Sequence, residues 1–235
     1  MELLMGYNGV KRMNNDNKSA YDSSIYDEHI VNVLPYYREY HDQIIDLVQI
    51  CKQDPIDWLD AGCGTGTLAS RVLEKEQNVR FTLCDPSEKM LNEAEKKLKD
   101  KNIRFIKAAS HEFDHDSEYD VITAVQSHHY YRPDERARAV SNCYRALRNG
   151  GIFITFENIR MSSETSDTIA MKRWVKFLRE HGNSEQDIKM HIDRRGVETF
   201  PITIEQHIDL LRRSGFRSVD ILWASYLQAG FMAIK

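Results

Sequence analysis

The chain has 235 residues, of which 41% are hydrophobic and 29% charged, and its formal net charge at pH 7 is −4. This composition is typical of a globular protein, and the sequence contains no apolar run of the roughly 20 residues that a membrane-spanning helix needs. An acidic total also disfavours the broad basic surface on which nucleic-acid binding usually depends. We therefore expect a cytoplasmic protein that binds neither a membrane nor a nucleic acid.

Residues 1–20 form a polar leader that lacks the long apolar core of a secretory signal. We expect this leader to be flexible, and Met1 and Met13 are alternative starts for the chain. The four cysteines lie far apart, so their spacing predicts neither a clustered metal site nor a disulfide framework. No metal is expected; the cysteines are Cys51, Cys63, Cys84 and Cys143.

Residues 21–52 are expected to form N-terminal cap helices, because Pro35 suits a first helical turn and an apolar face follows between Ile44 and Cys51. From residue 53 onward, short apolar runs alternate with helix-like segments, which favours a parallel sheet covered by helices on both faces. The expected strands are 56–61, 79–84, 103–107, 120–125 and 152–156, the expected helices are 67–75, 87–101 and 133–147, and a turn is expected at 149–151.

The alternation stops at residues 160–200, which are polar and helix-prone. Long connections in compact domains are often functional, so we expect a helical insertion that covers a substrate pocket together with residues 21–37. Residues 201–235 then supply a helix at 203–213 and closing strands at 218–223 and 226–234. We therefore expect a single domain over residues 21–235, in which residues 53–159 form the cofactor-binding core.

The stretch "LDAGCGTGTLAS", residues 59–70, carries Gly62, Gly64 and Gly66 between an expected strand and an expected helix. Glycine allows a backbone to turn sharply and to approach a ligand closely. Asp85 follows the next strand, where an acidic residue can bind ribose hydroxyls. The spacing is G-x-G-x-G, which fits a dinucleotide fingerprint poorly.

With these motifs, nearly the whole chain resembles the class I S-adenosylmethionine-dependent methyltransferases; the stretch "RALRNGG" at 145–151 is similar to the family's segment before strand five. The resemblance implies an α/β, Rossmann-like, doubly wound and mostly parallel seven-stranded sheet, with S-adenosylmethionine as cofactor. It implies that Asp60 and the loop hold the methionine end, Asp85 the ribose and Met90 the adenine. Ala109 and Ser110 stand where the family often has an acidic residue. The expected cofactor-binding residues are Asp60, Gly62, Cys63, Gly64, Gly66, Asp85, Pro86, Met90, Ala109, Ser110, Val125 and Gln126.

Substrate-side candidates follow the fourth and fifth expected strands. His128 and His129 are candidate general bases because histidine titrates near neutral pH, and packing is the alternative role for each. Glu157 is expected at the same rim. The expected substrate-binding residues are Tyr26, Trp174, Arg194 and Arg195.

Three functions remain open. The first is in-line methyl transfer to a small-molecule acceptor by a monomer or homodimer. The second is carboxy-S-adenosylmethionine synthesis, because the "VLPYYREYHDQII" segment and the helical insertion look like the synthase family of tRNA wobble-uridine modification. That family holds the extra carboxylate with an arginine, whereas a gapless match places Ile192 there and Arg194 two residues later. The third is a non-catalytic cofactor-binding protein.

Overall fold

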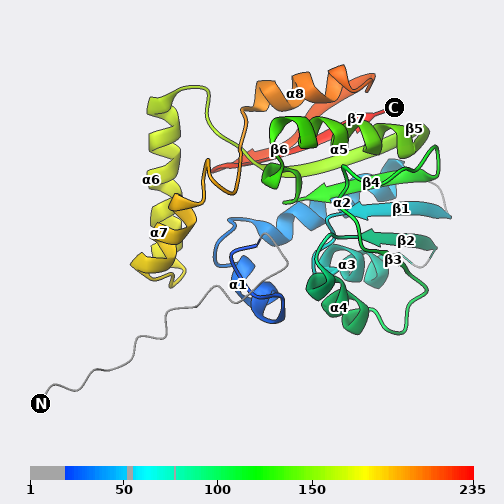
Figure 1. The fold of residues 1–235 in the computed structure, drawn as a ribbon, viewed down its shortest axis with the longest axis horizontal. Helices are drawn as coiled ribbons and strands as arrows, with labels where there is room; N and C mark the ends of the chain where they lie inside the picture. The colour runs from blue at the N-terminus through cyan, green and yellow to red at the C-terminus, as the bar shows by residue number, and fades with distance from the viewer. Residues whose placement is uncertain (1–18, 52–54, 77) are drawn as a thin grey trace, which may run out of the picture.

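The structure, a computed structural model, describes residues 19–51, 55–76 and 78–235 (Figure 1). Most of the expected leader, residues 1–18, lies outside the described residues. The N-terminal segment contains a 3-10 turn at Ser23–Ile25, then α1 (Tyr26–Ile30) and α2 (Tyr37–Cys51). The strands are β1 (Ile56–Ala61), β2 (Val79–Cys84), β3 (Arg104–Ile106), β4 (Tyr119–Val125), β5 (Leu147–Asn158), β6 (Ser218–Ser225) and β7 (Gln228–Ile234).

One seven-stranded sheet organises the molecule, in the order β3-β2-β1-β4-β5-β7-β6. The strands β1 to β5 pair in parallel, whereas β7 is antiparallel to β5 and β6 is antiparallel to β7. This arrangement confirms the expected doubly wound, mostly parallel fold. The order reverses between β1 and β4, and ligands of open α/β sheets bind at the carboxyl ends of strands that flank such a reversal.

Helices cover both faces of the sheet: α3 (Thr67–Lys75), α4 (Glu88–Lys97), α5 (Pro133–Ala146) and α8 (Ile204–Arg213), with α2 from the N-terminal segment. Apolar residues of α2 and α3 pack with Trp58 of β1 on one face. Residues of α5 and α8 pack with Leu59, the next residue of β1, on the other. Successive strand residues point to opposite faces, so a strand covered on both sides is apolar throughout.

Several element boundaries differ from the sequence-based prediction. The helix α2 begins at Tyr37, not at Pro35, because Tyr36 has a left-handed φ of +63° that interrupts helical geometry. The helix α4 ends at Lys97, four residues earlier than expected. The expected turn at 149–151 is an irregularity within β5, where Gly150, with φ +75°, donates its N–H to the Lys235 carbonyl. Pairing with the chain's last residue thus keeps this segment in the strand.

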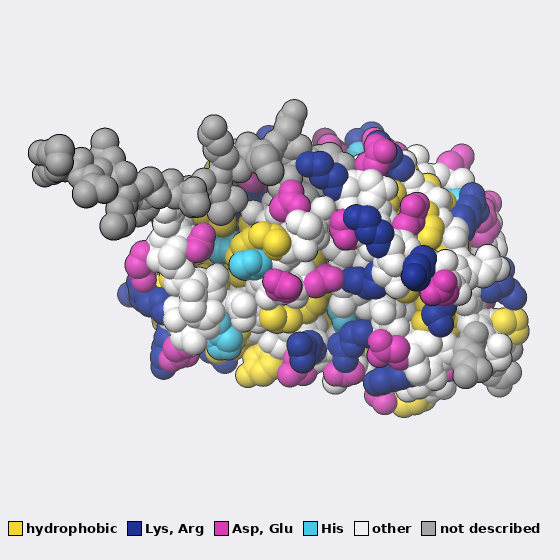
Figure 2. All heavy atoms as spheres, turned by 90° about the horizontal axis from the view of Figure 1, so that it is seen from below, with side chains coloured by type: hydrophobic (Ala, Val, Ile, Leu, Met, Phe, Trp, Pro, Cys, Tyr) yellow, Lys and Arg dark blue, Asp and Glu magenta, His cyan; other side chains and the backbone are white. Residues whose placement is uncertain are grey.

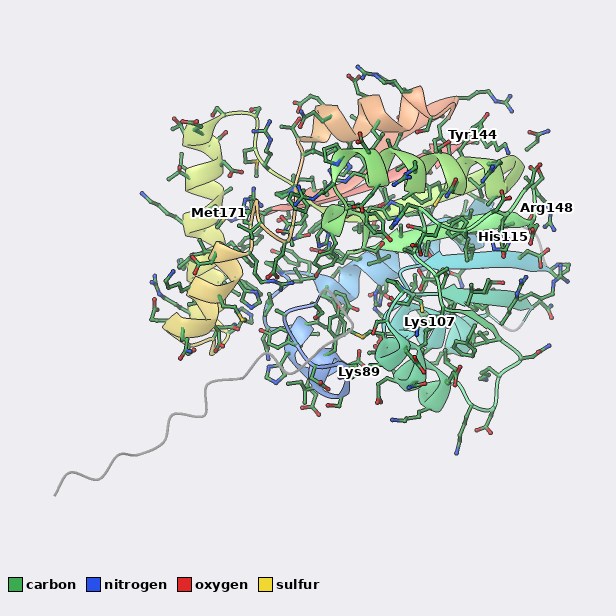
Figure 3. All side chains as sticks on the ribbon, in the orientation of Figure 1. Lys89, Lys107, His115, Tyr144, Arg148 and Met171 are labelled. Carbon is green, nitrogen blue, oxygen red and sulfur yellow. The ribbon has the colours of Figure 1, made fainter. Side chains whose placement is uncertain are left out.

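The expected insertion contains α6 (Glu164–Glu180) and α7 (Glu185–Asp193), which stand beyond one end of the sheet (Figure 1). Figure 3 shows Met171 of α6 far from Arg148, which forms ion pairs with Asp57 and Asp120 at the opposite end. The insertion contacts the N-terminal segment through the buried Trp174, whose Nε1–H donates to the Val33 carbonyl over 2.9 Å. Within the described residues, no helix is long and apolar enough to cross a membrane.

Candidate active site

The glycine loop leaves β1 beside the end of β2. The N–H groups of Gly62 and Cys63 both donate to the Cys84 carbonyl, over 2.7 and 3.0 Å. Gly62 has a φ of +88°, and a Cβ at this position would overlap the Cβ of Ser127, which follows β4. Only glycine therefore allows the loops after β1 and β4 to approach this closely.

Asp85 is buried at the end of β2 and fixes the shape of the loop. Its Oδ2 accepts the Gly64 N–H over 2.9 Å, and its Oδ1 accepts the Ser87 N–H over 2.9 Å. An acidic residue at the end of the second strand of such a sheet is placed to accept hydroxyl donors such as those of a ribose. The geometry thus suits the ribose-binding role that the resemblance implies.

Asp60, the last acidic residue of β1, is buried and accepts a hydrogen bond of 2.8 Å from Thr123 Oγ1. Burial raises the pKa of this carboxyl to about 7, and the neighbouring charge of Asp85 adds to the rise. A cation placed beside Asp60 would stabilise its ionised form. The site therefore fits the ammonium group of an amino-acid ligand.

A cavity of about 350 Å³ lies against the glycine loop. Its walls come from the loop, from the end of β4 and from the N-terminal segment, so residues distant in sequence enclose it. The lining residues are Tyr26, Tyr37, His41, Asp60, Gly62, Cys63, Gly64, Thr65, Thr67, Leu68 and Val125. We call this space the cofactor cavity.

The N-terminal segment is tied to the loop through Asp27. Its Oδ1 accepts hydrogen bonds from Thr65 Oγ1 (2.6 Å) and Thr67 Oγ1 (3.0 Å), and its Oδ2 forms an ion pair with Lys97 Nζ at 2.6 Å. These contacts hold the adjacent Tyr26 over the cofactor cavity. Sequence reasoning missed Asp27 because its partners lie about 40 and 70 residues away.

His41 of α2 was also missed, although a signal existed. It lies three residues before Ile44 and seven before Val48, on the buried apolar face of that helix. A histidine on such a face must find a polar partner or remain unpaired. The periodicity places it inward but does not show that the inward side borders a cavity.

The expected adenine-side residues are spread over several environments. Met90 is buried in the first turn of α4, whose cap is Ser87, and Pro86 is exposed between Asp85 and that cap. Ala109 is buried and donates its N–H to Glu112 Oε2. The Ser110 hydroxyl lies 3.0 Å from His128 Nε2 and 3.2 Å from the Tyr131 hydroxyl, so it belongs to a buried hydrogen-bond network.

Glu157, at the end of β5, accepts four hydrogen bonds from buried donors. Its Oε1 accepts the His128 N–H and the Thr155 hydroxyl, and its Oε2 accepts the N–H and the Nδ1–H of His129, the latter over 2.9 Å. Burial alone would raise the pKa of Glu157, but the hydrogen bond and charge of His129 outweigh it and lower the pKa to about 2. Glu157 is therefore an ionised acceptor near neutral pH.

The two adjacent histidines differ in environment. Because ionised Glu157 can only accept, Nδ1 of His129 carries a proton, and Nε2 is the ring nitrogen that remains to exchange a proton with a ligand. His129 also lines the second cavity described below. His128 is buried, bonded to Ser110, and burial lowers its pKa to about 4. His129 is therefore better placed than His128 to accept a proton from a ligand.

A second cavity, of about 630 Å³, lies between the sheet rim, the N-terminal segment and the insertion. It shares Tyr26 with the cofactor cavity, so the two spaces adjoin at that residue. Its lining includes the expected residues Gln126, His129, Trp174, Arg194 and Arg195, together with Ser19, Ala20, Tyr21, Ile30, Val33, Leu34, Tyr130, Asn158, His191 and Thr199. We call this space the acceptor cavity.

The two arginines of the acceptor cavity have different partners. Arg195 donates to Asn158 Oδ1 and the Ile159 carbonyl and forms an ion pair with Asp167 at 2.9 Å, so it ties the end of β5 to α6. Arg194 forms an ion pair with Glu198 at 2.6 Å, and a hydrogen bond from Arg194 lowers the pKa of Tyr130, although burial has the larger, raising effect. Of the two arginines, Arg194 is therefore the one that interacts with another ionisable residue of the cavity lining, Tyr130.

Within residues 19–51, 55–76 and 78–235, no group of three or more His, Cys, Asp and Glu side chains is arranged to hold a metal ion.

Gln126, which follows β4 at the rim of the site, has an unusual backbone conformation with a φ of +53°. Its side chain donates to Gln228 Oε1 over 2.7 Å. Backbone in this region is costly for non-glycine residues and is often found at functional sites.

Comparisons with known proteins agree with this site. A family described as a methyltransferase domain matches residues 59–151, from the end of β1 to β5. The chain is 25% identical over 215 residues to the carboxy-S-adenosyl-L-methionine synthase of Nautilia profundicola, covering 91% of this chain and 92% of that protein. It is 25% identical over 224 residues to the synthase of the same name from Staphylococcus epidermidis, covering 93% and 96%.

Solved structures show the same fold. The CurJ carbon methyltransferase superposes with a TM-score of 0.65 at 17% identity, covering 88% of this chain and 56% of that one. The YcgJ protein of Bacillus subtilis superposes with a TM-score of 0.65 at 13% identity, covering 85% and 99%. Together with the glycine loop and the sheet order, the match of residues 59–151 to a methyltransferase domain supports a class I S-adenosylmethionine-dependent methyltransferase fold that binds S-adenosylmethionine.

Proposed function

We propose that the protein transfers a methyl group from S-adenosylmethionine to a small-molecule acceptor. The observation that carries the proposal is the adjacency of the cofactor cavity and the acceptor cavity at Tyr26, with His129 on the acceptor side. In the view of Figure 2, acidic and basic side chains are interspersed over the surface. That mixture supports an enclosed small acceptor better than a polyanionic one.

The bound cofactor supplies an electrophilic methyl group on a positively charged sulfur. Tyr26 and the insertion exclude water and hold the acceptor nucleophile in line with the methyl carbon. During transfer of the methyl group, His129 Nε2 would accept the proton of the acceptor O–H or N–H group. Glu157 then stabilises the imidazolium through the Nδ1–H bond.

Identification of the ligand that the purified protein carries tests this proposal. Mass spectrometry of small molecules released by denaturation should find S-adenosylmethionine or S-adenosylhomocysteine. Incubation with methyl-labelled S-adenosylmethionine and a fractionated metabolite extract should then transfer label to a small product. His129→Gln should abolish this transfer while cofactor affinity stays unchanged. Undiminished transfer by His129→Gln would contradict the assigned base, and label that stays on the cofactor would contradict methyl transfer.

The second candidate is carboxy-S-adenosylmethionine synthesis. Two observations favour it: the synthase relatives span nearly the whole chain, and Arg194 borders the acceptor cavity. In this function Arg194 would bind the added carboxylate. The same mass spectrum separates the two functions. A carboxylated sulfonium among the released ligands favours the synthase, whereas S-adenosylhomocysteine without a carboxylated sulfonium favours methyl transfer.

A further inference from the structure

His41 is a buried histidine that lines the cofactor cavity and has one unpaired ring nitrogen. It is 2% exposed, and its Nδ1 has no hydrogen-bond partner among the described residues. The edge of its ring packs against Tyr37, with ring centroids 4.8 Å apart. An unpaired polar atom in a buried site has a desolvation cost that a ligand can remove.

Burial and the neighbouring positive charges keep the His41 ring neutral. Burial is the main cause that lowers its pKa to about 3, and Arg71 of α3 and Lys97 of α4 lower it further, against the opposing charges of Asp42 and Asp27. Arg71 forms an ion pair with Asp42 at 2.8 Å. A neutral ring has one N–H, and with that proton on Nδ1 the ring is a donor without an acceptor.

The lining of the cofactor cavity includes groups of complementary chemistry. Asp60 is an acidic group that favours a cation. The helix α3 begins at Thr67, and its N-cap residue is Gly66, which has no side chain to cap the first amides. The partial positive charge of a helix N-terminus favours an anion. A ligand that carries an ammonium group and a carboxylate on one carbon satisfies both sides.

We propose that His41 donates a hydrogen bond from Nδ1 to the carboxylate of the methionine part of S-adenosylmethionine, while Asp60 binds the ammonium group. The proposal rests on the cofactor and is independent of the transfer reaction. It makes the N-terminal helix α2 part of the cofactor site. Through this hydrogen bond, the N-terminal segment would contact the amino-acid end of the cofactor directly.

Calorimetric titration of the full chain tests the assignment with two ligands that differ only in the carboxylate: S-adenosylmethionine and decarboxylated S-adenosylmethionine. His41→Leu keeps the bulk of the ring but removes the donor, so it should weaken S-adenosylmethionine binding about tenfold or more. Its affinity for the decarboxylated ligand should remain within about twofold of wild type. His41→Asn places an amide N–H near the position of Nδ1 and should restore most of the lost affinity.

His207→Leu is the matched control. His207 is also buried with one unpaired ring nitrogen, but it stacks on Phe231 of β7 and does not line the cofactor cavity. The His207→Leu variant should leave the ratio of the affinities for S-adenosylmethionine and its decarboxylated form unchanged. Equal weakening of both ligands by His41→Leu, or a selective loss in His207→Leu, would overturn the role of His41. Failure of the wild-type chain to bind either ligand would instead contradict the cofactor assignment.

Discussion

Replacing Glu157 by Gln should destabilise the protein by an amount that depends on pH. The wild-type carboxyl is 1% exposed, and its pKa is lowered from 4.5 to about 2. A difference of roughly 2.5 units corresponds to about 3 kcal/mol of folding free energy. Because the folded pKa is depressed, this stabilisation is fully present above pH 4.5 and is lost as the pH falls toward 2.

The glutamine amide cannot reproduce the four accepted hydrogen bonds. Both carboxylate oxygens receive N–H donors, so either orientation of the amide points its own NH₂ group at a donor of His128 or His129. We expect Glu157→Gln to lower the free energy of unfolding by about 3 kcal/mol at pH 7 and by roughly half as much at pH 3.

Urea unfolding followed by circular dichroism, for wild type and variant across pH 7 to pH 3, measures this difference. Comparing the two proteins at each pH cancels the titration of groups that do not interact with Glu157. Thr155→Val serves as a control, because it removes one neutral donor to Glu157 and no titrating group. A penalty for Glu157→Gln that is the same at pH 7 and pH 3 would refute the assignment of a buried, ionised carboxylate.

Three further predictions concern the site. Asp85→Ala should weaken S-adenosylmethionine binding at least tenfold by calorimetry, since charge-assisted bonds to a ribose are lost; unchanged affinity would rule out this role. Gly62→Ala should abolish cofactor binding because the new Cβ overlaps Ser127, and adding Ser127→Gly should recover part of it; full binding by the single variant would contradict the loop geometry. Arg194→Ala should raise the KM for the acceptor with cofactor affinity unchanged, whereas Arg195→Ala should lower the melting temperature; the reverse pattern would exchange their roles.

The glycine loop after β1 and the turn after β2 were predictable because their signals are local. The glycine spacing, the acid at the end of the next strand and the Ser87 cap all lie within about 30 residues, and each has a fixed geometric consequence. The half of the site that the N-terminal segment forms was less predictable. The contacts of Asp27 and the inward position of His41 depend on how α1 and α2 pack over a loop that follows them in sequence. Periodicity identifies a buried face but not the ligand space behind it.

Position 192 shows how the structure changes the meaning of a sequence match. Ile192 is 39% exposed near the end of α7, whereas the side chain of Arg194, two residues later, is 11% exposed and borders the acceptor cavity. Two residues of helix differ by about 200° in direction, so neighbouring positions of this kind face opposite sides. An arginine at 192 would point toward solvent in this fold. If the chain binds a carboxylate in the acceptor cavity through α7, the binding residue is therefore Arg194, and Ile192→Arg should not substitute for it in an Arg194→Ala background.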